Sequence, residues 1–231
     1  MAGNTHQEGR LQARPAMEET EEAAPVGLRS LGLTATRDGY LYVPATYRPK
    51  RSAPLALLLH GAGEDARDGL ALLRAQADAA GLILLAPTSR EYTWDLLVGR
   101  RYGPDVAGID QALDHTFSNY SVDPKRVAVG GYSDGASYAL SLGIANGDLL
   151  THVLAFSPGF AAPPGQVGYP RIFVSHCTRD RWLPIDRCSR RVAPQLKLAG
   201  YEVRYREFEG GHVVPPKMAR EAVNWFTTEG D

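Results

Sequence analysis

The sequence predicts an α/β fold in which a mostly parallel central sheet is covered by helices on both faces. Short apolar runs recur along the chain and alternate with segments whose apolar residues repeat at helical spacing. Several of these runs are apolar without interruption, which is typical of strands buried on both faces of a parallel sheet. A chain of 231 residues is also long enough to form one substantial core.

In the first half of the chain, three apolar runs are separated by helical patterns. The run over 54–59 ends abruptly at His60 and Gly61, as expected for a buried strand that enters a loop. Pro104 opens a helix, because proline is well tolerated at the first helical position. Residues 88–103 show no clear period. The pattern predicts strands over 39–47, 54–59 and 82–86, and helices from Leu70 to Gly81 and from Pro104 to Phe117.

The second half continues the same alternation. Ligands of such parallel sheets bind beyond the carboxyl ends of the strands, and every candidate catalytic residue below lies at that edge. This agreement carries more weight than any single motif. The expected strands span 127–129, 153–156, 172–174 and 203–208, and the expected helices follow Gly135 and cover 187–198 and 216–226.

Residues 1–27 differ in composition from the rest of the chain, being polar and carrying a cluster of four glutamates between positions 18 and 22. This composition predicts a disordered leader, with a partner-binding or dimer-swapping arm as the alternative. The segment lacks the apolar stretch of a secretory signal peptide, so a cytoplasmic location is the default expectation. Residues 28–231 are expected to form a single domain.

Charge and composition argue against several classes of function. A net charge of -1 gives no reason to expect a nucleic-acid partner, which would normally require a basic patch. No run approaches about twenty apolar residues, so no membrane-spanning helix is expected. Cys177 and Cys188 are too few for a disulfide framework, and we expect two buried thiols, with a single bridge as the alternative.

The segment from Gly131 to Gly135 matches the pattern G-x-S-x-G, with Ser133 at its centre. An apolar run precedes it and a helical pattern follows, which is the context in which this motif forms a sharp strand-to-helix turn. Bulky side chains beside the serine would clash there, and the glycines avoid this. The helix also directs its positive end toward the site. We therefore expect Ser133 to be a nucleophile, a structural turn with an incidental serine being the alternative.

Acyl transfer also requires donors for the oxygen that becomes negative in the transition state. In this kind of site, one donor is the backbone N–H after the nucleophile, here Asp134. The second comes from the loop after an earlier strand, where His60 to Gly63 lie. Ala62 is the predicted second donor, and His60 is expected to support the loop rather than act as a base.

The base and the acid follow from chain order, which in this kind of site is serine, then carboxylate, then histidine. Asp180 is the first carboxylate after the expected strand over 172–174, with Asp186 as the alternative. His212 lies between glycines and the end of the last expected strand, and we expect it to be the base. The remaining histidines lie too early in the chain: His6, His60, His115, His152 and His176.

With these residues in place, the chain resembles the phospholipase/carboxylesterase family of α/β-hydrolases, which includes acyl-protein thioesterases and small bacterial carboxylesterases. The resemblance covers Gly39 to Phe226 and rests on LLLHGAGED, AVGGYSDGASYALSLG, VLAFSPGF, SHCTRDRWLPID and EGGHVVP. It implies a hydrolase of esters or thioesters that uses neither metal nor cofactor. One departure is Cys177, where the family usually has glycine between His176 and Thr178, and we expect activity to survive it.

The sequence thus predicts a serine hydrolase that cleaves carboxylic esters with small or medium acyl groups through an acyl-enzyme intermediate. Residues 157–170 are too few for a helical cap, so we expect an α/β-hydrolase without a large cap domain, with an open site for small soluble esters. Gly61, Trp94 and Trp182 are candidate substrate-binding residues, and core packing is the alternative for both tryptophans.

Other functions remain as alternatives at this point. The same catalytic arrangement serves polyester depolymerases, feruloyl-type esterases and acyl thioesterases. A different class is a catalytically silent, hydrolase-like binding protein, which would have no need of Ser133, Asp180 and His212 together. The expected partner is a small-molecule ester, and the sequence leaves a homodimer open.

Overall fold

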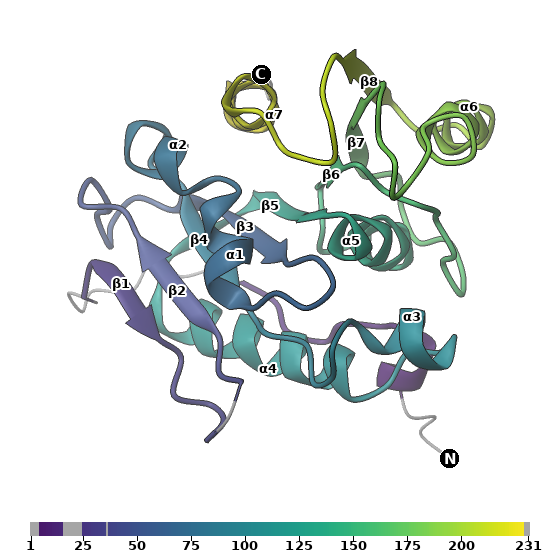
Figure 1. Cartoon of the computed structure of the whole chain (residues 1–231). Coiled ribbons are helices and arrows are strands. Elements are labelled where there is room, and N and C mark those ends of the chain that lie inside the picture. The colour runs from purple at the N-terminus through teal and green to yellow at the C-terminus, as the bar shows by residue number, and fades with distance from the viewer. Residues whose placement is uncertain (1–4, 16–24, 36, 229–231) are drawn as a thin grey trace.

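The computed structural model describes residues 5–15, 25–35 and 37–228. Its eight strands form one sheet in the order β1-β2-β4-β3-β5-β6-β7-β8 (Figure 1). β2 pairs antiparallel with both β1 and β4, and the other pairs are parallel, which confirms the predicted sheet. The strands are β1 (Gly27–Ser30), β2 (Tyr40–Val43), β3 (Ala53–Leu59), β4 (Ile83–Ala86), β5 (Val122–Tyr132), β6 (His152–Phe156), β7 (Arg171–Cys177) and β8 (Val203–Phe208).

Helices cover both faces of this sheet. One core contains side chains of α4, α5 and α6, and the other contains side chains of α1, α2 and α7. The helices lie correspondingly on opposite sides of the strands in Figure 1. The bounds are η1 (Thr5–Glu8, a 3-10 helix), α1 (Ala66–Ala71), α2 (Arg74–Ala80), α3 (Asp95–Gly99), α4 (Pro104–Asn119), α5 (Asp134–Ala145), α6 (Ser189–Leu198) and α7 (Pro216–Thr228).

The central strand β3 shows how the sequence produces two cores. All seven of its residues are buried. Leu55, Leu57 and Leu59 belong to the first core, whereas Ala56 and Leu58 belong to the second. Successive side chains of a strand point to opposite faces, so a continuous apolar run is required where both faces are covered. The carboxyl end of β3, at Leu59, is thereby anchored in both cores.

Some elements differ from the prediction. The helix expected from Leu70 to Gly81 is two helices, because Leu73 leaves helical geometry at φ -127° and ψ 3° and its side chain is buried. The strand expected over 39–47 ends at Val43, since Pro44 has no N–H to continue the pairing. The segment without a clear period contains the short helix α3. No described helix is long and apolar enough to span a membrane.

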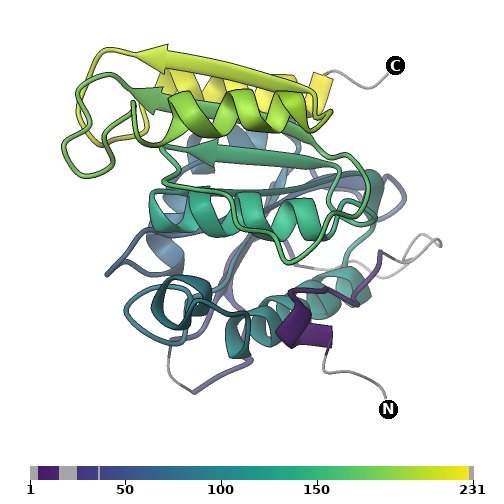
Figure 2. The ribbon, with the colours of Figure 1, turned by 90° about the vertical axis from the view of Figure 1, so that its right-hand side faces the viewer.

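The structure corrects the expectation of a disordered leader for residues 5–15, which lie beside α4 and the end of α5 (Figure 2). Leu11 is buried, and its N–H donates to Asn146 Oδ1 at 2.8 Å. Asn146 Nδ2 donates in turn to the Gly9 carbonyl at 2.7 Å. The amide of Asn146 thus accepts from one backbone N–H and donates to one backbone carbonyl, as a neighbouring strand would. Both buried backbone groups therefore have hydrogen-bond partners. Of the predicted leader, residues 1–4 and 16–24 lie outside the described residues.

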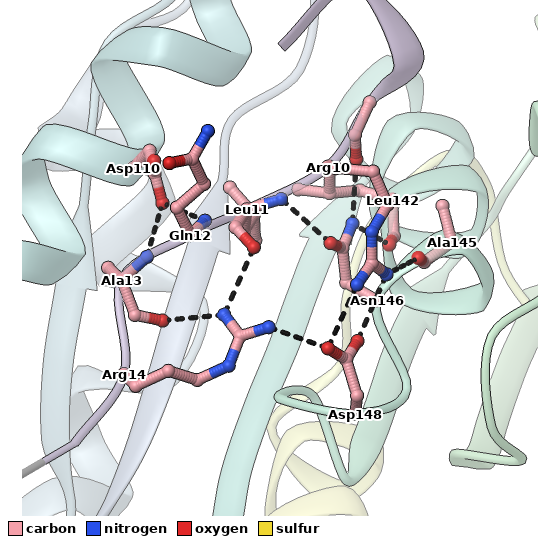
Figure 3. A network of polar contacts seen from close by, with 11 residues as sticks. Arg10, Leu11, Gln12, Ala13, Arg14, Asp110, Leu142, Ala145, Asn146 and Asp148 are labelled. Carbon is pink, nitrogen blue, oxygen red and sulfur yellow. Dashed lines mark hydrogen bonds and ion pairs between the residues drawn. The ribbon is translucent and has the colours of Figure 1, made fainter. Parts of the chain in front are cut away.

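Charged groups hold the same segment from its exposed side (Figure 3). Arg10 and Arg14 both pair with Asp148, at 2.9 and 2.6 Å. Asp110 Oδ1 accepts the N–H groups of Gln12 and Ala13 at 2.8 and 2.9 Å. A polar composition therefore does not prevent this segment from packing, because its partners are polar groups more than ninety residues away in sequence.

We expect Asn146→Ala to lower the free energy of unfolding by about 2–4 kcal/mol, because the change leaves the buried Leu11 N–H and Gly9 carbonyl without partners. Urea unfolding followed by circular dichroism measures this. Asp148→Asn is the matched control on the exposed side of the same segment, and surface ion pairs contribute only about 0–1 kcal/mol. Equal unfolding midpoints for Asn146→Ala and the wild type would contradict the prediction.

Candidate active site

Ser133 occupies a sharp turn between the end of β5 and the start of α5. Its φ of 56° and ψ of -118° lie in a region that residues other than glycine rarely adopt. A Cβ at position 135 would lie 2.1 Å from the Leu59 carbonyl oxygen, and one at position 131 would lie 2.4 Å from the Gly135 carbonyl carbon. Both glycines are therefore required for the helix to begin directly against β3, with Ser133 at the apex.

The structure brings Ser133, His212 and Asp180 together from three separate loops. His212 Nε2 lies 2.9 Å from Ser133 Oγ. His212 Nδ1 lies 2.5 Å from Asp180 Oδ2. A carboxylate can only accept, so the network assigns the proton to Nδ1 and leaves Nε2 free to accept from the serine hydroxyl. This is the protonation state that a general base requires.

Asp180 follows β7 and is held by its own loop. Its Oδ1 accepts the N–H groups of Trp182 at 2.9 Å and Leu183 at 2.8 Å. Burial alone would raise the pKa of Asp180, but these two hydrogen bonds and the one from His212 lower it below its ordinary value. The carboxyl group is therefore ionised at neutral pH and faces the imidazole.

His176 lies behind Asp180, and its position in the sequence predicted no role for it. Its Nε2 lies 2.8 Å from the Leu183 carbonyl oxygen and 3.3 Å from Asp180 Oδ2. The Ser189 hydroxyl lies 2.6 Å from its Nδ1. Burial lowers the pKa of His176, so the ring is neutral, donates through Nε2 and accepts through Nδ1. The sequence signal that could have indicated this contact is the position of His176 at the end of β7, four residues before Asp180.

The loop of His212 is held by Tyr132, the residue before Ser133. The Tyr132 hydroxyl donates to the His212 carbonyl at 2.6 Å, and the two rings lie 4.8 Å apart. Gly211 has no atom within 4 Å of an added Cβ, so the loop around it is open. The sequence did not predict this role for Tyr132, because the second position of the pattern G-x-S-x-G accepts any residue.

The loop after β3 is oriented by His60, which is buried. The Ser89 N–H donates to His60 Nε2 at 3.0 Å, so Nδ1 carries the proton and donates to the Gly61 carbonyl at 2.7 Å. In a trans peptide the carbonyl and the following N–H point in opposite directions. The Ala62 N–H therefore points away from His60. The Gly61 N–H donates to Glu64 Oε2 at 2.8 Å and is thus already engaged.

Residues 105–228 match the family model for phospholipases and carboxylesterases. The chain belongs to the phospholipase/carboxylesterase family. Esterase PE8, a solved structure, aligns with 81% of this chain and 96% of its own at a TM-score of 0.64 and 22% identity, which shows a shared α/β-hydrolase fold. The family resemblance and the fold predicted from the sequence are both confirmed.

Two relatives of this phospholipase/carboxylesterase family member are acetylxylan esterases. A bifunctional acetylxylan esterase/xylanase of Neocallimastix patriciarum is 28% identical over 155 residues, which are 63% of this chain and 22% of that protein. An acetylxylan esterase of Coprinopsis cinerea is 32% identical over 120 residues, which are 47% of this chain and 32% of that protein. The matched region thus spans less than a third of each relative.

The two tryptophans occupy different environments in this family member. Trp94 is fully buried between the rings of His60 and Tyr138, and its Nε1 donates to the His60 carbonyl at 2.9 Å. Its expected place in a substrate pocket is therefore wrong, and core packing applies instead. Trp182 is 82% exposed beside the acid loop. Hydrophobicity alone could not separate these two positions.

The remaining candidates lie outside the Ser133–His212–Asp180 contacts. Asp186 is exposed and pairs with Arg190 at 2.8 Å rather than with a histidine. Cys177 and Cys188 are buried free thiols, and burial raises the pKa of Cys177 to about 11, so it stays protonated. Among the described residues, no group of three or more His, Cys, Asp and Glu side chains is arranged to hold a metal ion.

Proposed function

We propose that the chain is a serine hydrolase that cleaves carboxylic esters through an acyl-enzyme intermediate. The observation that carries the proposal is the position of His212, within hydrogen-bond distance of both Ser133 Oγ and Asp180 Oδ2. Ser133 attacks the ester carbonyl while His212 takes its proton and then gives it to the leaving alcohol. Water attacks the acyl-enzyme by the same route. Asp180 holds the imidazole and stabilises its charged form.

The N–H groups of Ala62 and Asp134 are the proposed donors to the oxyanion. Asp134 is the first residue of α5, so its N–H has no partner within the helix. The orientation that His60 imposes directs the Ala62 N–H away from the loop's own hydrogen bonds. The positive end of α5 adds to the stabilisation of negative charge at Ser133. Removing one such donor typically costs about 2.7–4 kcal/mol of transition-state stabilisation.

The proposed substrates are soluble esters with small acyl groups. Residues 157–170, between β6 and β7, contain no helix that would cover the site. The acetylxylan esterases among the relatives act on the smallest common acyl group, which supports the same proposal. We propose that the site also accepts a bulky alcohol half, because the described residues 157–170 form no helical cap.

We expect the wild type to hydrolyse p-nitrophenyl acetate with a kcat/KM several-fold above that for p-nitrophenyl decanoate. The absence of a covering cap is the reason, since a long chain gains no enclosed apolar surface. A fluorophosphonate probe is expected to label the tryptic peptide that contains Ser133, as detected by mass spectrometry.

Heat-denatured protein is the control for the labelling, because the serine is activated only in the folded site. A folded protein that neither reacts with the probe nor hydrolyses any ester would support a catalytically silent binding protein. A preference for decanoate or for acyl thioesters would contradict the proposed substrate class.

A further inference from the structure

Two large aromatic side chains are exposed to solvent at the carboxyl edge of the sheet. Trp182 is 82% exposed and Tyr92 is 72% exposed. Trp182 follows β7 and Tyr92 follows β4, and β5 with Ser133 at its end lies between these strands in the sheet. The loops that carry these two residues therefore lie on opposite sides of the turn that carries Ser133. Exposed aromatic side chains on the loops of a candidate active site are available to contact a substrate.

Both residues are tied through their backbones to the loops of the candidate active site. The Trp182 N–H donates to Asp180 Oδ1 at 2.9 Å. The Tyr92 carbonyl accepts the Gly63 N–H at 2.8 Å, and a Cβ at Gly63 would lie 2.9 Å from the Tyr92 ring. The backbones that carry both rings are thus fixed by the loops of the candidate active site, although neither ring is packed in the core.

Charged residues lie in the same loops as the two aromatic residues or in the loop after β3. Glu64 uses Oε2 to accept the Gly61 N–H, and no described residue donates to its Oε1. Glu64 is close enough to His212 and Tyr132 for their charges to influence one another. Glu91 and Arg181 are the exposed neighbours of Tyr92 and Trp182 in sequence. The rim of the site therefore combines flat apolar faces with groups that form hydrogen bonds.

We propose that Trp182 and Tyr92, together with Glu64, bind the successive sugar residues of a carbohydrate that forms the alcohol half of the ester. A sugar presents an apolar face of C–H groups and a rim of hydroxyl groups, which match an aromatic ring and a carboxylate acceptor. A lipid surface matches less well, because Glu64 would be desolvated against hydrocarbon. This inference rests on the ester hydrolase activity proposed above.

The test compares two acetyl esters that share an acyl group and differ in the alcohol. For Trp182→Ala, we expect kcat/KM on acetylated xylooligosaccharides to fall about tenfold or more, mainly through KM, because the variant loses the stacking surface. On p-nitrophenyl acetate the loss should be several-fold smaller. Trp182→Phe should recover most of the difference, since it restores a flat ring.

Tyr169→Ala is the matched control. Tyr169 is another exposed aromatic residue, at 67%, but it precedes β7 and so lies at the opposite edge of the sheet from Trp182. Both substrates should be hydrolysed by this variant as by the wild type. If Trp182→Ala changes kcat/KM equally on both substrates, or changes it on neither, the sugar subsite is overturned. The proposed esterase activity would not be affected by either result.

Two further outcomes separate the inference from the proposed function. A wild type that hydrolyses neither acetyl ester would refute the esterase itself rather than the subsite. A selective loss by Trp182→Ala on a long-chain ester presented in phosphatidylcholine vesicles would assign the rings to a lipid surface instead, and would overturn the sugar subsite.

Discussion

The Ser133→Ala variant is expected to hydrolyse p-nitrophenyl acetate with a kcat about 10⁴- to 10⁶-fold below that of the wild type. The change removes the oxygen that lies 2.9 Å from His212 Nε2, and no acyl-enzyme can then form. Any remaining rate would come from the oxyanion donors and substrate binding alone. Initial-rate assays with purified protein measure the loss of kcat. Titration with the fluorophosphonate probe should give no adduct.

Ser118→Ala is the matched control for this prediction. Ser118 is an exposed serine near the end of α4, and its replacement should leave both activity and labelling unchanged. Near-wild-type hydrolysis by Ser133→Ala, with unchanged circular dichroism, would show that another group attacks the ester. The proposed function would then fail at its first step.

The local features of the site were predictable because they depend on neighbours in sequence. The turn at Ser133 requires glycine at positions 131 and 135, and both are visible in the sequence pattern alone. His212 lies 79 residues from Ser133 and 32 from Asp180, yet chain order and the common edge of a parallel sheet indicated all three residues. The rule that the carboxyl ends of parallel strands share one edge therefore indicated that the three residues lie close together, although the sequence gives no distances between them.

Features that depend on tertiary contacts were not predictable in the same way. Trp94 and Trp182 both lie in segments that mix polar and apolar residues, but one is fully buried and the other 82% exposed. Leu11 is buried through Asn146, which lies 135 residues further along the chain. Composition describes a segment alone, whereas burial depends on what the folded domain presents to it. For this reason the leader was expected to be disordered and is packed over residues 5–15.

The Asp180→Asn variant is expected to lose about 10⁴-fold in kcat while keeping its fold, because the change reverses one hydrogen bond. The amide oxygen can replace Oδ1 and still accept the N–H groups of Trp182 and Leu183. The amide NH₂ then faces His212 Nδ1, which must accept rather than donate. The proton moves to Nε2, where it points at Ser133 Oγ and prevents the ring from acting as a base.

Asp186→Asn separates the chemical effect from a general loss of negative charge in the same loop. Asp186 pairs only with the exposed Arg190 among the described residues, so its variant should retain wild-type rates. Initial rates for both variants, with unfolding midpoints measured alongside, decide between the two carboxylates. An active Asp180→Asn paired with an inactive Asp186→Asn would move the acid to position 186. Loss of activity only in Asp180→Asn, without loss of stability, is the result that the Asp180–His212 contact requires.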